Sequence, residues 1–336
     1  MVARTRYFVI ASLLVLGVGL GTGLVAYYVG FPAGAFQRAG GPPELQFVPR
    51  DVTVIAYADV RDVMTSELRQ KLHSVIPMPP TGQHEFEEKT GINIETDIDR
   101  IVACLNPSPQ SHNSVGMVIA RGRFNEVKIE ALMREHGAQV EDYRGKRLIA
   151  GTAGQGAENH NFAASFLEPG LVALGSTSLV RAAIDLHQTG DNPQAGLQSV
   201  TGNEELMNLV HSLESGNAWA VGRFDALQAR ARLPQELTTR LPAITWFAVS
   251  GHINGGIRGV LRAEARDDEA ANNLRDVVRG FLALAKMQSG GRPELQAMMQ
   301  SLELSGTGKT VALSFTVPAE IFDAVAAMAG KKPQVQ

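Results

Sequence analysis

An uncharged run near the N-terminus constrains this chain more than any other feature of its sequence. Tyr7–Val29 covers 23 positions without a charged side chain. At about 1.5 Å rise per residue, a helix of that length is roughly 34 Å long, which is enough to cross the hydrocarbon core of a bilayer. The sequence therefore predicts a transmembrane helix over residues 7–29 and argues against a freely soluble cytoplasmic protein.

The residues on either side of this run predict its orientation. Arg4 and Arg6 precede it, and the next basic residue is Arg38. The positive-inside rule places residues 1–6 in the cytoplasm and the rest of the chain outside it, in the periplasm or at the cell surface. Aromatic residues lie where the two membrane interfaces are expected, namely Tyr7, Phe8, Tyr27 and Tyr28.

A cleaved signal peptide competes with the uncleaved anchor, because Ala33-Gly34-Ala35 resembles a signal-peptidase site. The uncharged run is longer than the apolar region of ordinary signal peptides, about 7–15 residues, which favours the anchor. Residues 30–50 are rich in Gly and Pro, and we expect a flexible linker there.

Glycine spacing within the run suggests self-association of the span. Gly17 and Gly21 form one G-x-x-x-G pair, and Gly19 and Gly23 form another. This spacing lets two helix backbones approach closely and predicts a homodimer through the span. The high frequency of glycine in membrane helices is the competing explanation.

Charge and cysteine content exclude several classes of protein. Lys and Arg number 31 against 34 Asp and Glu, so the formal net charge is −3. A mildly acidic chain lacks the basic surface of a nucleic-acid-binding protein. Cys104 is the single cysteine, so no intramolecular disulfide can form and stability must come from apolar cores.

Beyond the linker, the pattern of periods and turns predicts two tandem modules. Residues 51–190 form the first, 191–215 a connector, 216–330 the second and 331–336 a polar tail. The second module reads β-α-β-β-α-β-β-α, and the first adds one hairpin. This order predicts an α+β fold of two ferredoxin-like, split βαβ modules with antiparallel sheets. Hairpin turns are expected at four places: Arg144-Gly145, Glu168-Pro169-Gly170, Asn254-Gly255-Gly256 and Gly306-Thr307-Gly308.

Motifs with catalytic or metal-binding potential are incomplete. Gly308-Lys309-Thr310 ends like a P-loop, but Glu303 stands where the first glycine is required. His84-Glu85 begins like a metalloprotease motif, but Glu88 replaces the second histidine. We therefore expect no catalytic residue, cofactor or metal ion, although a site assembled only in the fold stays open.

Arginines recur at the strand-to-helix junctions of both modules. Arg121 and Arg123 flank a glycine in the first, and Arg223 follows a glycine in the second. Arginines at a helix N-terminus can bind an anion. The competing interpretation is a structural junction in a repeated module.

Three segments resemble uncharacterised bacterial envelope-anchored proteins that carry a domain of unknown function. They are residues 48–60 (VPRDVTVIAYADV), 166–173 (FLEPGLVA) and 250–256 (SGHINGG). The resemblance implies bacterial origin and membrane anchorage, and it implies no activity.

Anchor, linker and repeated module together favour a membrane-anchored extracytoplasmic binding protein without catalysis. Its expected partners are the lipid bilayer and another envelope protein or lipid. Two alternatives stay open: an envelope hydrolase with a site assembled in the fold, and a carrier of an apolar ligand between the modules. An exposed apolar patch would favour binding, and a deep cleft with convergent polar groups would favour an enzyme.

Overall fold

A computed structural model describes residues 41–75, 87–88, 90–106, 115–153, 160–224, 243–288 and 293–321. The predicted span over residues 7–29, with its interfacial aromatic residues and glycine pairs, lies outside these ranges. Among the described helices, none is both long enough and apolar enough to cross a bilayer. The predicted pair of ferredoxin-like modules is corrected: the described strands are antiparallel and have a different order, which is given below for each unit.

The chain divides into two compact units. The N-terminal unit contains Gly34–Arg61 and Pro79–Ser212, and the C-terminal unit contains Asp62–Met78 and Leu213–Gln336. The segment 62–78, predicted within the first module, belongs to the C-terminal unit for a physical reason. Its Val63 and Leu68 pack with Ile253, and the Leu68 N–H donates to the Asn254 carbonyl at 2.7 Å.

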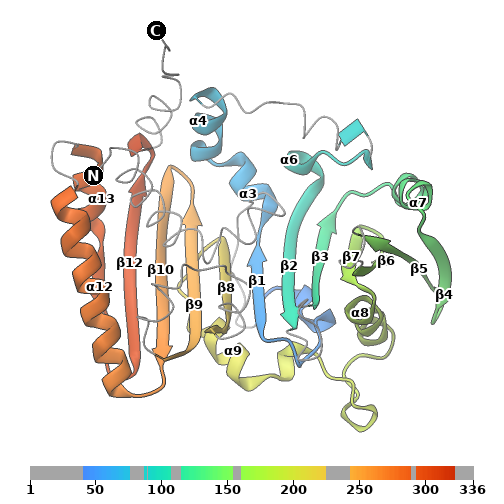
Figure 1. Ribbon diagram of the computed structural model, residues 1–336. Coiled ribbons are helices and arrows are strands. Elements are labelled where there is room, and N and C mark those ends of the chain that lie inside the picture. The colour runs from blue at the N-terminus through green and yellow to red at the C-terminus, as the bar shows by residue number, and fades with distance from the viewer. Residues whose placement is uncertain are drawn as a thin grey trace. The chain divides into compact units, whose positions relative to one another are not determined.

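The N-terminal unit is built on a sheet of seven described strands in the order β1-β2-β3-β7-β6-β5-β4 (Figure 1). The strands are β1 (Val54–Ala58), β2 (Ile98–Asn106), β3 (Val115–Gly122), β4 (Gln139–Tyr143), β5 (Lys146–Ala153), β6 (His160–Glu168) and β7 (Leu171–Ser176). The helices are η1 (Pro43–Phe47), α6 (Ile94–Asp97), α7 (Glu126–Glu135), α8 (Thr177–Thr189), η3 (Pro193–Ala195), η4 (Val200–Gly202) and α9 (Glu204–His211), and α3 (Val60–Thr65) leads out of the unit.

Strand pairing in this unit contradicts the split βαβ prediction. In a split βαβ arrangement the first and second strands are separated by another strand. Here β1 pairs directly with β2, with Ile55 opposite Cys104, and β4 to β7 form a meander that returns β7 to β3. Every described pair in the unit is antiparallel. The connection through α7 joins β3 to β4 across the three strands of the meander, whereas a split βαβ connection passes over a single strand.

The two faces of this sheet are covered differently. Helix α8 packs on β6 and β7 on one face, where its Leu179, Val180 and Ile184 are buried (Figure 1). Helix α7 packs on β5 from the other face, to which the Arg147 side chain also projects to reach Glu130 of α7. We call these the α8 face and the α7 face.

The C-terminal unit has a sheet of five described strands in the order β11-β12-β10-β9-β8. Its elements are α4 (Glu67–Val75), β8 (Ala218–Arg223), β9 (Ile244–Ile253), β10 (Gly256–Ala265), α12 (Asp268–Gln288), α13 (Pro293–Ser301), β11 (Glu303–Ser305) and β12 (Thr310–Pro318). Its first described strand β8 again pairs directly with the second, β9, so this module is not ferredoxin-like either. Helix α12 packs through Ala270, Ala271 and Leu274 onto the sheet.

All four predicted hairpin turns are confirmed. The β4–β5 turn is the clearest, because Arg144 and Gly145 both have positive φ, 53° and 75°. Two consecutive positive φ angles fit the type I′ geometry, whose twist matches that of the flanking strands. Glu168-Pro169-Gly170 connects β6 to β7, and the two glycine-rich turns connect β9 to β10 and β11 to β12.

Cys104 on β2 supplies a natural probe of the N-terminal unit. It is 2% exposed, and burial raises the pKa of its thiol to about 12. Because reaction needs an accessible thiolate, we expect a disulfide reagent at pH 8 to label the native chain about a thousandfold more slowly than the guanidinium-unfolded chain. Absorbance of the released thiol measures both rates, and comparable rates would contradict the burial of Cys104.

Candidate functional site

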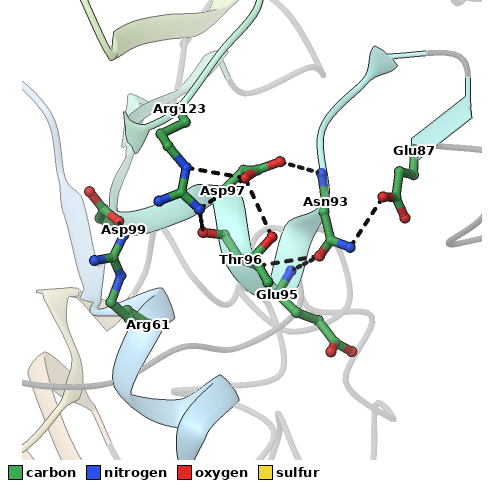
Figure 2. A network of polar contacts seen from close by, with 8 residues as sticks. All are labelled: Arg61, Glu87, Asn93, Glu95, Thr96, Asp97, Asp99 and Arg123. Atoms are coloured by element: carbon green, nitrogen blue, oxygen red, sulfur yellow. Dashed lines mark hydrogen bonds and ion pairs between the residues drawn. The ribbon is translucent and has the colours of Figure 1, made fainter.

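Arg123 joins the end of β3 to the turn that precedes β2. Its guanidinium donates to Asp97 Oδ1 from Nη2 at 3.1 Å and to the Thr96 carbonyl, and Figure 2 shows it turned toward both. Asp97 Oδ2 in turn accepts from the backbone N–H of Asn93 at 2.9 Å. Partial burial opposes ionisation, but these hydrogen bonds prevail and lower the pKa of Asp97. Arg123 therefore stabilises a turn of its own chain.

The same turn is capped by an asparagine. Asn93 precedes α6, and its side-chain oxygen accepts from the backbone N–H groups of Glu95 at 3.0 Å and Thr96 at 3.2 Å (Figure 2). Beside this network, Arg61 forms an ion pair with Asp99. The segment is thus an N-capped helical turn that charged pairs hold in place, and these polar residues stabilise the fold.

Arg121 enters a different network, on the α8 face. Its Nε donates to Glu44 Oε1 at 2.6 Å and its Nη2 to Glu168 Oε1 at 2.8 Å. Although burial opposes it, these two carboxylates raise the pKa of Arg121. The Arg121 hydrogen bond in turn lowers the pKa of Glu168. Glu44, Arg100, Arg121, Glu168 and His187 are hereafter the Glu44 cluster.

Glu44 is the most buried member of the cluster, with 1% of its side chain exposed. Arg100 Nε lies 3.2 Å from Glu44 Oε1 but lacks hydrogen-bond geometry, and Glu44 Oε2 has no hydrogen-bond partner among the described residues. Tyr57 lies next to this pair, and burial followed by the charge of Asp59 raises its pKa. A buried carboxylate with one unpaired oxygen depends on its arginines, because leaving it unpaired in the interior is costly.

His187 closes the cluster from α8. Its ring centroid lies 5.3 Å from that of Phe47, and its Nε2 is 3.9 Å from Glu168 Oε2. Burial, with the nearby charge of Lys146, lowers the pKa of His187 although Glu168 opposes the shift. His187 is therefore neutral at neutral pH, and its contact with Glu168 is not a salt bridge under those conditions.

The arginines that were predicted to bind an anion do not share one site. Arg121 donates to two carboxylates of its own chain, and Arg123 to a carboxylate and a carbonyl. Arg223 is exposed at the end of β8 in the C-terminal unit. Anion binding at these arginines stays a prediction, and Arg121 and Arg123 already pair with carboxylates of their own chain.

Residues that could bind a metal ion do not gather in the described ranges. No group of three His, Cys, Asp and Glu side chains is placed to bind a metal ion there. The Gly308-Lys309 segment lies in the β11–β12 hairpin and not before a helix, as predicted. The His84-Glu85 pair lies outside the described residues.

A second candidate is the part of the α7 face that is only half-buried or exposed. One row of directly paired residues crosses this face: Ala103, Val118, Leu174, Ala164 and Ile149. On the side nearest α7, Ala164 is 0% and Ile149 1% exposed. In the middle of the row the cover is only partial, since Ala103 and Val118 are half-buried and Leu174 is 38% exposed, whereas Ala56, opposite Ala103 on β1, is 6% exposed.

The rows on either side of this one extend the apolar surface. Leu105 and Gly116 are paired in one row and Ile101 and Ala120 in the next. Val172 continues the second row. Ile101 and Val172 in these rows are buried, at 1% and 9% exposure. The remaining, less covered area is hereafter the open half-face: Ala103, Leu105, Gly116, Val118, Ala120 and Leu174, all of them half-buried or exposed and none polar in its side chain.

Sequence reasoning missed the open half-face, although β3 carried a signal for it. A strand with one solvated face alternates apolar and polar residues, whereas residues 115–120 read VGMVIA, without a polar side chain. Such a strand needs cover on both faces, and the described helices give β3 cover on the α8 face.

Comparison with known proteins gives no family. No family model and no curated protein matches the chain, so the resemblance to envelope-anchored proteins stays a prediction. Among solved structures, crystal form I of TP0453 aligns at a TM-score of 0.42 and 9% identity, covering 84% of this chain and 96% of that one. At this TM-score and identity the similarity supports no inference about function.

Proposed function

We propose that this chain is a binding protein without catalysis, and that its N-terminal unit receives an amphipathic helix of a partner protein on the open half-face. The observation that carries the proposal is the exposure of Leu174 within an apolar area that contains no charged side chain. Contiguous apolar surface of this kind is unfavourable in water and is typical of interaction sites.

The neighbouring helix supports a helical occupant. α7 packs on the other half of the same face, and none of its residues is buried, with Val127 81% exposed. A second helix beside α7 would lie at the usual spacing of about 8–10 Å between helix axes and would cover the flank of α7 together with the sheet. The partner thus completes a helix layer that α7 begins.

The shape and chemistry of the surface argue against other occupants. An acyl chain gains most from enclosure in a concave site, and a sheet face covers it from one side only. The small residues Ala103, Gly116 and Ala120 leave room between strands for the larger side chains of a helix. A helix with apolar residues at i, i+3, i+4 and i+7 supplies such side chains.

A photocrosslinking amino acid in place of Leu174 tests the proposal. We expect an adduct in native membranes or extract whose peptide lies on the apolar side of an amphipathic helix of another protein. The matched control is the same amino acid at Leu284, which is 44% exposed on α12 of the C-terminal unit. Its yield of this adduct is expected to be about tenfold lower, and Leu174→Asp should weaken partner binding about tenfold.

Three outcomes would overturn this proposal. They are an adduct with lipid, an adduct with a second copy of this chain, and equal yields at positions 174 and 284. Unreactive Cys104 in the Leu174→Asp variant confirms that loss of binding does not come from unfolding of the N-terminal unit.

A further inference from the structure

Residues 43–48 form a short segment, hereafter the strap, that is held onto the α8 face of the N-terminal unit. Leu45 and Val48 are 0% and Phe47 8% exposed, and η1 contacts α8 and η4. Burial of three apolar side chains in six residues shows that the strap is docked and not a free linker.

The two ends of the strap are held by different interactions. At the C-terminal end, the Val48 carbonyl accepts from the Val200 N–H at 2.7 Å, and the Arg50 N–H donates to the Gln198 carbonyl at 2.9 Å. These bonds are between neutral groups. The N-terminal end is held by Glu44, whose carboxylate pairs with Arg121 and Arg100.

His187 connects the ionic end of the strap to titration near neutral pH. Three residues surround His187. Phe47 of η1 packs against its ring, Glu168 at the end of β6 lies near its Nε2, and Lys146 of β5 places a positive charge nearby. Farther along the same network, Arg121 of β3 joins Glu168 to Glu44. On α8 itself, Asp185 pairs with Arg144 of the β4–β5 turn and with Tyr143 of β4.

Protonated His187 would meet an unfavourable site. Its Nδ1 is buried without a hydrogen-bond partner among the described residues, and its ring lies against Phe47. Although 20% of the side chain is exposed, an N–H donor at the buried Nδ1 without such a partner is costly, and moving the strap away would let water reach it.

We propose that the strap is an acid-sensitive element, which acidification releases from the N-terminal unit while the sheet and α8 stay folded. Its neutral bonds to η4 act as the hinge. This inference is independent of the partner site, because the strap lies on the α8 face and the open half-face is on the other.

The direction of the pH dependence follows from His187. Burial first, then Lys146, lowers the pKa of His187 below its ordinary 6.5, so docking is favoured above that pH and weakens as pH falls through it. The lowered pKa of Glu168 comes chiefly from Arg121, which stays on the sheet when the strap is released, so it adds nothing to this pH dependence.

Hydrogen exchange of the full chain, corrected for intrinsic rates, tests the proposal. The Leu45 N–H donates to the Pro42 carbonyl just before the strap, and the Val48 N–H donates to the Leu45 carbonyl within it. Their protection is expected to fall about tenfold between pH 7.5 and 5.0, while that of β6 amides is retained. Equal strap protection at the two pH values, or parallel loss in β6, would overturn the proposal.

Two variants and one control assign the effect to the Glu44 cluster. His187→Gln should keep strap protection at pH 5.0, and Glu44→Gln should lower it at both pH values. His211→Gln, at an exposed position of α9, should behave as the unchanged chain. A His187→Gln chain that still loses protection at pH 5.0 would overturn the role of His187, and unchanged protection in Glu44→Gln would overturn the role of the ionic end.

Discussion

Replacing Glu44 by alanine is expected to lower the free energy of unfolding of the N-terminal unit by about 3–5 kcal/mol, the usual cost of removing one partner of a buried ion pair. The Glu44 carboxylate is 1% exposed and accepts from Arg121 at 2.6 Å. Without it, Arg121 keeps only Glu168 in this network and Arg100 loses its carboxylate. The variant also weakens the docking of the apolar strap residues next to Glu44.

Natural probes separate the two units in this measurement. Cys104 lies in the N-terminal unit, whereas both tryptophans, Trp219 and Trp246, lie in the C-terminal unit. Pulsed thiol labelling across a guanidinium titration therefore follows the first unit, and tryptophan fluorescence follows the second. In the Glu44→Ala variant, only the unfolding transition followed by thiol labelling is expected to show the full loss of stability.

An exposed ion pair of the same unit supplies the matched control for this variant. Glu141 pairs with Arg181 and is 47% exposed. Its replacement by alanine should cost less than about 1 kcal/mol, because water screens exposed pairs. Equal losses for Glu44→Ala and Glu141→Ala would show that burial adds nothing to the Glu44 pair.

Local structure in this protein could be predicted from sequence, and long-range pairing could not. A turn such as Arg144-Gly145 is set by the backbone angles of its own two residues. The residue types at the turn are therefore enough to predict the hairpins. The return of β7 to β3, with Met117 opposite Gly175, joins residues far apart in the chain. No local pattern distinguishes that pairing from a split βαβ arrangement, which has a similar order of elements.

The candidate sites show the same division. Arg121 was singled out from its place before a helix, but its partner Glu44 lies within residues 30–50, which Gly and Pro content marked as a flexible linker. The apolar spacing of Leu45, Phe47 and Val48 was a signal for burial. The ion pair itself has no such signal, because it joins residues 77 positions apart.

Replacing Gly122 by alanine is the second large expected effect, a loss of about 3 kcal/mol in the stability of the N-terminal unit. A Cβ at this position would lie 2.1 Å from the Asp97 carbonyl oxygen and 2.9 Å from the Ile98 Cα. Both are backbone atoms, so the β2–β3 contact must open. The same carbonyl accepts from the Arg123 N–H at 2.6 Å, and that bond would be strained as well.

Gly116 on the same strand is the matched control. A Cβ there would meet the Leu105 side chain at 3.1 Å, and a leucine can rotate away, so Gly116→Ala should cost less than about 1 kcal/mol. Pulsed labelling of Cys104 measures both variants. A large difference in stability between the two variants would show that position 122 needs glycine because the backbone of Asp97 and Ile98 lies so close. Arg121 and Arg123 on either side would then each belong to a separate network. Equal small losses of stability would contradict this explanation and would favour anion binding as the reason for the arginine-glycine-arginine segment.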